Sequence, residues 1–253
     1  MIELKLGDCL ELMKDIPDKS VALVLCDLPY GTTDCKWDTV IPFDSLWQQY
    51  NRIIKDNGVI ILHGSEPFST LLRYSNLKMY KYDWIWKKNT VTGFQHAKNM
   101  PLKDYETISV FSKGSMGHFS ILGERRMPYN PQGLMPCKKI YKGTRNDGGI
   151  IGTRPSHKAV VQQEFTNYPR MILEFTNEKG LHPTQKPVAL LEYLVKTYTN
   201  PGEVVLDNCM GSGSTGVACV NTGRSFIGME LDEGYFEIAK KRIQEAQERG
   251  KND

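Results

Sequence analysis

Four consecutive residues, Asp27, Leu28, Pro29 and Tyr30, carry the groups that can activate the amino group of an aromatic base. Such an amine is a poor nucleophile because its lone pair is delocalised into the ring. Two acceptors that hold its two N–H groups push the nitrogen toward a pyramidal geometry, and here they are the Asp27 carboxylate and the Leu28 carbonyl. Pro29 biases Leu28 away from the helical region, and Tyr30 can stack on a base that has left its duplex. The motif predicts a site that acts on a base amino group, although a generic turn would explain the tetrapeptide taken alone.

A glycine-rich turn near the end of the sequence has the spacing of a nucleotide-binding loop. Gly211-x-Gly213-x-x-Gly216 follows the apolar run 203–207, and Glu230 ends the next apolar run. Glycines allow a tight turn and a close approach of the backbone to a ligand, and the acid accepts hydrogen bonds from ribose hydroxyls. Taken alone, this pattern fits NAD and S-adenosylmethionine equally.

Two observations favour S-adenosylmethionine as the cofactor. Only one βαβα unit remains after residue 203, whereas a dinucleotide-binding fold needs further strands after its glycine turn. Asp207 suits the cationic amino and sulfonium groups of S-adenosylmethionine better than a pyrophosphate, although an isolated Asp also fits a helix cap. An NAD-dependent oxidoreductase is the alternative from a different class.

The elements that must position these two motifs alternate between strand and helix. Apolar runs predict strands at 2–6, 21–25, 58–62, 82–86, 107–111, 203–207 and 225–229. Helical spacing predicts helices at 43–54, 67–74, 188–198, 214–222 and from 232 onward, with a stop for the first of them at Asn57-Gly58. The alternation predicts an α/β fold with a doubly wound, mostly parallel sheet, on which ligands bind where the winding reverses. We therefore expect the strands that end at Asp27 and Asp207 to be neighbours.

Residues 113–180 interrupt this alternation and are too long for an ordinary connection. No helix or parallel strand is assigned there, because Gly, Pro, Asn and basic residues dominate. From Ser112 to Gly180 there are eleven Lys and Arg residues against five Asp and Glu, although the whole chain has a net charge of only +3. The densest part contains Lys138, Lys139, Lys142, Arg145, Arg154 and Lys158, opposed by Asp147. The stretch fits phosphate binding, and a solvated loop with surface lysines explains it equally well.

The composition argues against several other classes of protein. Six cysteines show no CxxC pair and no metal-ligand spacing, so no metal site is expected. No apolar run approaches the roughly 18 residues that span a bilayer. Residues 1–5 lack the apolar stretch of a signal peptide, so a cytoplasmic location is expected.

The order of the motifs, with Asp27–Tyr30 first and the glycine turn last, resembles the β group of amino-methylating DNA methyltransferases. Segments 7–9, 181–187 and 228–232 resemble that family too, and the resemblance covers nearly the whole chain. It implies a Rossmann-like methyltransferase core at 1–112 and 181–253 with a target-recognition insertion at 113–180. Double-stranded DNA would be the partner, in a prokaryotic or phage-infected cell. A homodimer, a cognate restriction nuclease outside this chain and the recognition sequence are left open.

The resemblance also implies roles for individual residues. Asp27, Leu28, Pro29 and Tyr30 would be catalytic. The cofactor-binding residues would be Asp8 and Cys9 near the adenine, Thr184 and Lys186 at the methionine end, Asp207, Asn208, Cys209, Gly211, Ser212 and Gly213 around the turn, and Glu230 and Leu231 at the ribose. The family most often has proline in place of Leu28 and Pro-Phe in place of Asn208-Cys209. A looser turn and the loss of an aromatic contact with the cofactor are therefore expected.

The acid at position 27 resembles adenine-N6 enzymes, whereas serine is typical of cytosine-N4 enzymes. We therefore expect methylation of adenine N6, with cytosine N4 as the alternative. A third class, a DNA-binding module that binds the cofactor without catalysis, is disfavoured by the intact catalytic motif. Two further features stay open. His63 follows the strand 58–62 and fits a structural contact as well as a functional one, and Phe94 in the stretch 93–99 could fill the gap left by an extruded base.

Overall fold

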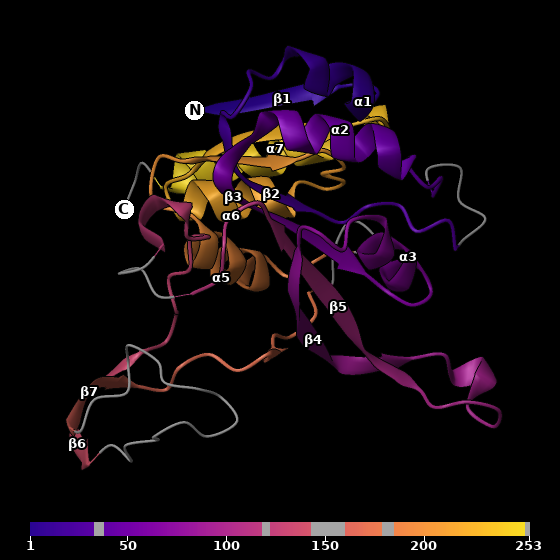
Figure 1. Cartoon of the computed structure of the whole chain (residues 1–253). Coiled ribbons are helices and arrows are strands. Elements are labelled where there is room, and N and C mark those ends of the chain that lie inside the picture. Colours follow the sequence, from indigo (N-terminus) through magenta and orange to yellow (C-terminus); the bar gives the residue numbers. More distant parts are fainter. Residues whose placement is uncertain (33–37, 118–121, 143–159, 179–184, 251–253) are drawn as a thin grey trace. The chain divides into compact units, whose positions relative to one another are not determined.

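A computed structural model describes residues 1–32, 38–117, 122–142, 160–178 and 185–250 (Figure 1). The chain divides into two compact units. The larger contains residues 1–130 and 171–253, and the smaller contains residues 131–170. The insertion expected at 113–180 is thus longer than the smaller unit, because residues 113–130 and 171–180 belong to the larger unit.

A sheet of eight described strands forms the centre of the larger unit, in the order β1-β10-β9-β2-β3-β5-β4-β8. Its strands are β1 (Ile2–Leu6), β10 (Ser225–Glu230), β9 (Val204–Asp207), β2 (Val21–Cys26), β3 (Ile54–Gly64), β5 (Lys103–Ser112), β4 (Tyr80–Thr92) and β8 (Ile172–Glu174). Of these strands β5 alone runs against the others. The expectation of a doubly wound, mostly parallel α/β sheet is confirmed.

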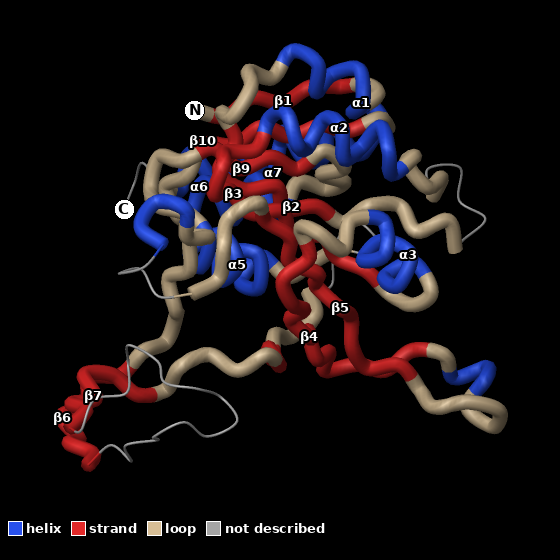
Figure 2. The backbone as a smooth tube through the Cα atoms, viewed as in Figure 1, coloured by secondary structure: helices blue, strands red, loops and turns tan. Residues whose placement is uncertain are grey.

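Helices cover both faces of this sheet (Figure 2). One face is packed by α5 (Val188–Tyr198), α6 (Ser214–Asn221) and α7 (Glu233–Arg249). The other is packed by α1 (Cys9–Leu12), the 3-10 turn η1 (Met13–Asp15), α2 (Phe43–Ile53) and α3 (Phe68–Ser75). Because alternate side chains of a strand face opposite ways, Leu23 and Leu25 of β2 join the first layer while Val24 and Cys26 join the second. A strand buried on both sides explains the continuous apolar run in the sequence.

One predicted bound is wrong, and one strand was not predicted. The strand expected from Gly58 begins at Ile54, directly after α2, because Ile54 already pairs with Val21. A parallel strand, β8, lies within the stretch where none was expected, and it pairs with residues 85–87 of β4. Three residues are too few to show a hydrophobic period, so only the pairing partner reveals this strand.

Strands β4 and β5 continue beyond the parallel strands as a two-stranded extension, here called the arm, residues 88–105 (Figure 1). Its tip contains the 3-10 turn η2 (Phe94–His96) and two exposed apolar side chains, Phe94 and Met100. Lys98 and Lys103 are also exposed. The arm therefore presents apolar and basic groups to solvent.

The smaller unit contains an antiparallel pair, β6 (Met135–Lys142) and β7 (Val160–Thr166). Of the basic residues noted in the sequence, Lys138, Lys139 and Lys142 lie on β6. Arg145, Arg154 and Lys158 lie outside the described residues. In the described part of the chain no helix is long and apolar enough to cross a membrane.

Candidate active site

The strands that end at Asp27 and Asp207 are neighbours, as expected from the motif order. β2 and β9 pair in parallel, with Leu23 opposite Val205 and Val24 opposite Leu206. From β2 the chain winds toward β3, and from β9 it winds back toward β10, so the winding reverses between these two strands. A cavity of about 450 Å³ lies at their carboxyl ends, within the usual range for small-ligand sites. The two motifs thus contribute to one site.

Fourteen of the sixteen predicted site residues line this cavity. They are Asp8, Cys9, Asp27, Leu28, Pro29, Tyr30, Lys186, Asp207, Asn208, Cys209, Gly211, Ser212, Glu230 and Leu231. Thr184 lies outside the described residues. Gly213 does not line the cavity; it begins α6 at φ +80°, and a Cβ there would lie 2.9 Å from the backbone of Ala239 in α7. Its role is close helix packing.

The glycine turn is held open toward the cavity. Gly211 has φ +51°, and no atom lies within 4 Å of where its Cβ would be. Its N–H donates to Glu230 at 2.8 Å, and the same carboxylate accepts from the N–H groups of Leu231 and Asp232. The backbone thereby fixes an acid at the cavity wall, where it suits the hydroxyls of a ribose.

Asp207 is buried below the turn and organises it. Its carboxylate accepts from the Thr215 hydroxyl at 2.6 Å and from the Cys209 N–H at 3.1 Å. Burial raises the pKa of Asp207 to about 6. The N-cap residue of α6 is Gly213, so the carboxylate is not a simple helix cap.

The Asp-Leu-Pro-Tyr turn is fixed by an acid that the sequence reasoning missed. The Asp38 carboxylate accepts from the backbone N–H groups of Tyr30, Gly31 and Thr32 at 2.7 to 2.9 Å. The Tyr30 ring stacks on Phe68 of α3, with ring centroids 4.8 Å apart. Its hydroxyl donates to Asp27 at 2.5 Å, and burial followed by the Asp27 charge raises the pKa of this phenol well above its usual value. Tyr30 therefore stays protonated and orients the carboxylate.

Asp27 of the motif and three other polar residues gather because each continues an apolar row on the same face of the sheet. They are Asp27 after β2, His63 on β3, Glu106 on β5 and Lys88 on β4. The rows that they continue are Leu23 and Leu25, Val59 and Ile61, Ile108 and Val110, and Trp84 and Trp86. Strand pairing places His63 opposite Ile108 and Trp86 opposite Glu106. This alternation was visible in the sequence, but only the strand order brings the four side chains together.

Lys186, which precedes α5, joins the two carboxylates of this cluster. Its ammonium ion-pairs with Asp27 and lies 3.4 Å from Oε2 of Glu106, whose other oxygen accepts from Lys88. Burial lowers the pKa of this ammonium, but Asp27 and Glu106 outweigh burial and hold it above its usual value. Burial likewise raises the pKa of Glu106, but Lys186 and Lys88 bring it down to about 2. Both groups are therefore charged at neutral pH.

His63 lines the same cavity and is 1% exposed. Neither ring nitrogen has a hydrogen-bond partner among the described residues. Burial, and next the charge of Lys186, lower the pKa of His63 to about 4. The imidazole is therefore neutral at pH 7. A structural hydrogen bond, one of the two roles open from the sequence, is not found among the described residues.

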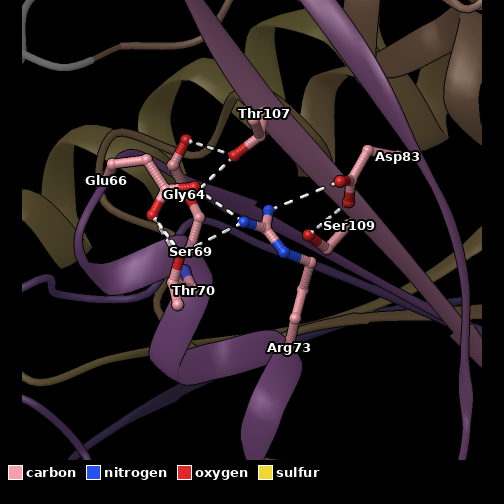
Figure 3. A network of polar contacts seen from close by, with 8 residues as sticks. All are labelled: Gly64, Glu66, Ser69, Thr70, Arg73, Asp83, Thr107 and Ser109. Carbon is pink, nitrogen blue, oxygen red and sulfur yellow. Dashed lines mark hydrogen bonds and ion pairs between the residues drawn. The ribbon is translucent and has the colours of Figure 1, made fainter. Parts of the chain in front are cut away.

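A polar network supports the site from the opposite face of the sheet (Figure 3). The Thr107 hydroxyl donates to the carbonyl of Gly64 at 2.9 Å, which ties β5 to the end of β3. Arg73 of α3 pairs with Glu66 at 2.6 Å and with Asp83 of β4 at 3.4 Å. The network thereby holds the residues that directly follow His63 and Glu106 in the chain.

Residues 21–241 match the model of a family described as DNA methylase, of the N6/N4 methyltransferase type. The chain belongs to this DNA methylase family. As a member of it, the methylase is an S-adenosylmethionine-dependent amino-methyltransferase of DNA. The residues of the cavity fit that cofactor. Gly211 leaves space beside Glu230, and the carboxylates of Asp8, Asp27 and Asp207 also line the wall.

Similar proteins span almost the whole methylase. The type II methyltransferase M.HpaI of Haemophilus parainfluenzae is 26% identical over 94% of this chain and 72% of its own length. The DNA adenine methyltransferase YhdJ of Escherichia coli K12 is 26% identical over 94% of this chain and 81% of its own. Among solved structures, the M1.HpyAVI–SAM complex has a TM-score of 0.62 at 25% identity, over 96% of this chain and all of that one. The cytosine-N4-specific PvuII DNA methyltransferase, at 15% identity and a TM-score of 0.66 over 98% of this chain and 92% of its own, shares the fold.

Proposed function

We propose that the methylase transfers the methyl group of S-adenosylmethionine to the N6 amino group of adenine at a specific sequence in duplex DNA. The observation that supports this most strongly is the position of Asp27. Its carboxylate lies at the carboxyl end of β2, lines the cavity and neighbours the glycine turn that follows β9. An acid at this position, where cytosine-N4 enzymes typically have serine, favours adenine.

The residues of the chain activate the amine rather than form a covalent intermediate. Asp27 accepts one N–H of the extruded base, and the Leu28 carbonyl accepts the other. S-adenosylmethionine supplies a methyl group bound to a cationic sulfur, and the remainder of the cofactor is the leaving group, a neutral thioether. As the new N–C bond forms, the amino nitrogen becomes positively charged, and it then releases one proton to the Asp27 carboxylate. Placement of the two partners therefore supplies most of the catalysis.

Two further parts of the chain are proposed to contact DNA. The smaller unit, residues 131–170, has basic residues on β6 that suit phosphates, and we assign target recognition to it. The arm has exposed Lys98 and Lys103 together with Phe94 at its tip. We assign to Phe94 the filling of the space that an extruded base leaves.

The product nucleoside tests this proposal directly. The protein is incubated with labelled S-adenosylmethionine and duplex DNA of mixed sequence, and the DNA is digested to nucleosides. Label in N6-methyldeoxyadenosine is the expected result. Label in N4-methyldeoxycytidine would favour the alternative acceptor, and no label with DNA from several sources would refute DNA methylation by this chain.

A further inference from the structure

The proposed catalytic carboxylate shares its lysine with a second carboxylate. The Lys186 ammonium ion-pairs with Asp27 and is 3.4 Å from Oε2 of Glu106. Within the described part of the chain this Oε2 accepts no hydrogen bond, whereas the other oxygen of Glu106 is engaged by Lys88. A small side-chain movement would carry the ammonium from one carboxylate to the other.

Burial restricts where this ammonium can go. The side chain of Lys186 is 8% exposed and that of Glu106 is 13% exposed. A buried ammonium without a counter-charge is strongly disfavoured, so Lys186 can leave Asp27 only for another anion. Glu106 stays ionised at neutral pH because its pKa is held near 2. His63, which lines the same cavity, is neutral and adds no competing charge.

Lys186 at Asp27 opposes the proposed reaction. The ammonium occupies one oxygen of the carboxylate and withdraws charge from it, which weakens it as an acceptor for the target N–H. Positive charge also develops on the amino nitrogen as the N–C bond forms. A free carboxylate stabilises that charge, and an adjacent ammonium repels it. Transfer should therefore be faster when Lys186 lies on Glu106.

We propose that Glu106 is a positioning residue that draws Lys186 away from Asp27 when the target amino group arrives, and so makes the Asp27 carboxylate available to it. The inference rests on the proposed function only in taking Asp27 as the acceptor of the target amine. It holds whether that amine belongs to adenine or cytosine.

The variant Glu106→Gln tests this, because it keeps the shape of the side chain and removes the charge that attracts Lys186. We expect the single-turnover rate of methyl transfer, at saturating cofactor and DNA, to fall about 10- to 100-fold. The dissociation constant for DNA should change by less than about twofold. Glu106→Asp, which restores the charge, should recover part of the rate. The matched control is Glu203→Gln. Glu203 forms an ion pair with Lys55 at 2.7 Å and does not line the cavity, so this variant should leave the rate unchanged.

A double-mutant cycle shows whether Glu106 acts through Lys186. Lys186→Met is expected to alter the rate by itself, and in that background Glu106→Gln should slow transfer no further. An equal slowing in both backgrounds would refute the positioning role, and so would an unchanged rate in folded Glu106→Gln. Thermal unfolding of each variant establishes that it is folded.

The proposed function is tested separately in the same assay. Wild type that transfers no methyl group to DNA, or Asp27→Ala that remains active, would contradict the function itself. Active wild type and inactive Asp27→Ala, with Glu106→Gln at the wild-type rate, would refute only the role of Glu106.

Discussion

At the scale of single residues, the site depends on charges that balance one another in a partly dry environment. Asp27 and Glu106 are opposed by Lys186 and Lys88, and His63 among them is neutral. Removing one member of such a set leaves another charge buried without compensation, which costs several kcal/mol. Single substitutions here are therefore expected to affect stability as well as rate. The double-mutant cycle of Glu106 and Lys186 is more informative, because it compares variants within the same set of charges.

His63 should make the stability of the folded chain depend on pH. The pKa of this imidazole is about 4 when folded and 6.5 when unfolded, so the unfolded state binds more protons between these values. The stabilisation is complete above pH 6.5 and is lost as the pH falls toward 4. Between pH 7 and pH 5 the loss amounts to about 2 kcal/mol in the free energy of unfolding. Asp207, with its raised pKa of about 6, acts in the opposite sense.

Urea unfolding of His63→Gln and wild type at pH 7 and pH 5 isolates this contribution. The variant should lose less stability on acidification than the wild type. His96→Gln, which changes an exposed histidine on the arm, should behave like the wild type. An identical loss in His63→Gln and wild type would show that His63 does not carry this pH dependence.

The part of the site formed by contiguous motifs was predictable from sequence. The part that depends on strand pairing was not. Asp27 and Tyr30 stand together in the chain, so the sequence alone predicted that they share a site. Glu106 and Lys88 have no such neighbours, and they reach the site only because β5 and β4 pair beside β3. Asp38 was missed since its role depends on how a turn folds back onto three backbone N–H groups.

At the scale of elements, the arm offers the clearest test of DNA contact. Phe94 is 67% exposed at the tip of the arm, where Met100 is exposed as well. If Phe94 fills the space of the extruded base, Phe94→Ala should lower methylation of a matched duplex about tenfold or more. A duplex with a mismatch at the target base should recover much of that loss, because extrusion then costs less.

Leu71→Ala is the matched control for this measurement, since Leu71 is a similarly exposed apolar residue on α3. It should methylate both duplexes as the wild type does. A loss in Phe94→Ala that is equal for matched and mismatched DNA would contradict the space-filling role and would leave the arm as a general contact surface.

Elements were predictable where they are long and buried. β2 and α5 lie within a residue of their predicted bounds, because burial on both faces of a strand and one face of a helix leaves a clear pattern. β8 has only three residues and is defined by its pairing with β4. Local propensity cannot report such a strand.

At the scale of the whole larger unit, topology joins motifs that are far apart in sequence. The chain enters the sheet centre at β2, winds outward through β3 and returns at β9, which lies beside β2. Asp27, the acid proposed to activate the amine, and the glycine turn therefore share one cavity. We propose that these two halves form one site with separate tasks, one for the acceptor and one for the cofactor.

Asp27→Ala tests that claim most directly, with methyl transfer to duplex DNA and calorimetric binding of S-adenosylmethionine measured on the same preparation. We expect that transfer is lost while the dissociation constant of the cofactor changes by less than about threefold, because the glycine turn and Glu230 are untouched. Asp56→Ala, at an exposed site, should retain both activities. Methyl transfer retained by Asp27→Ala, or transfer and cofactor binding lost together in a folded variant, would contradict that claim.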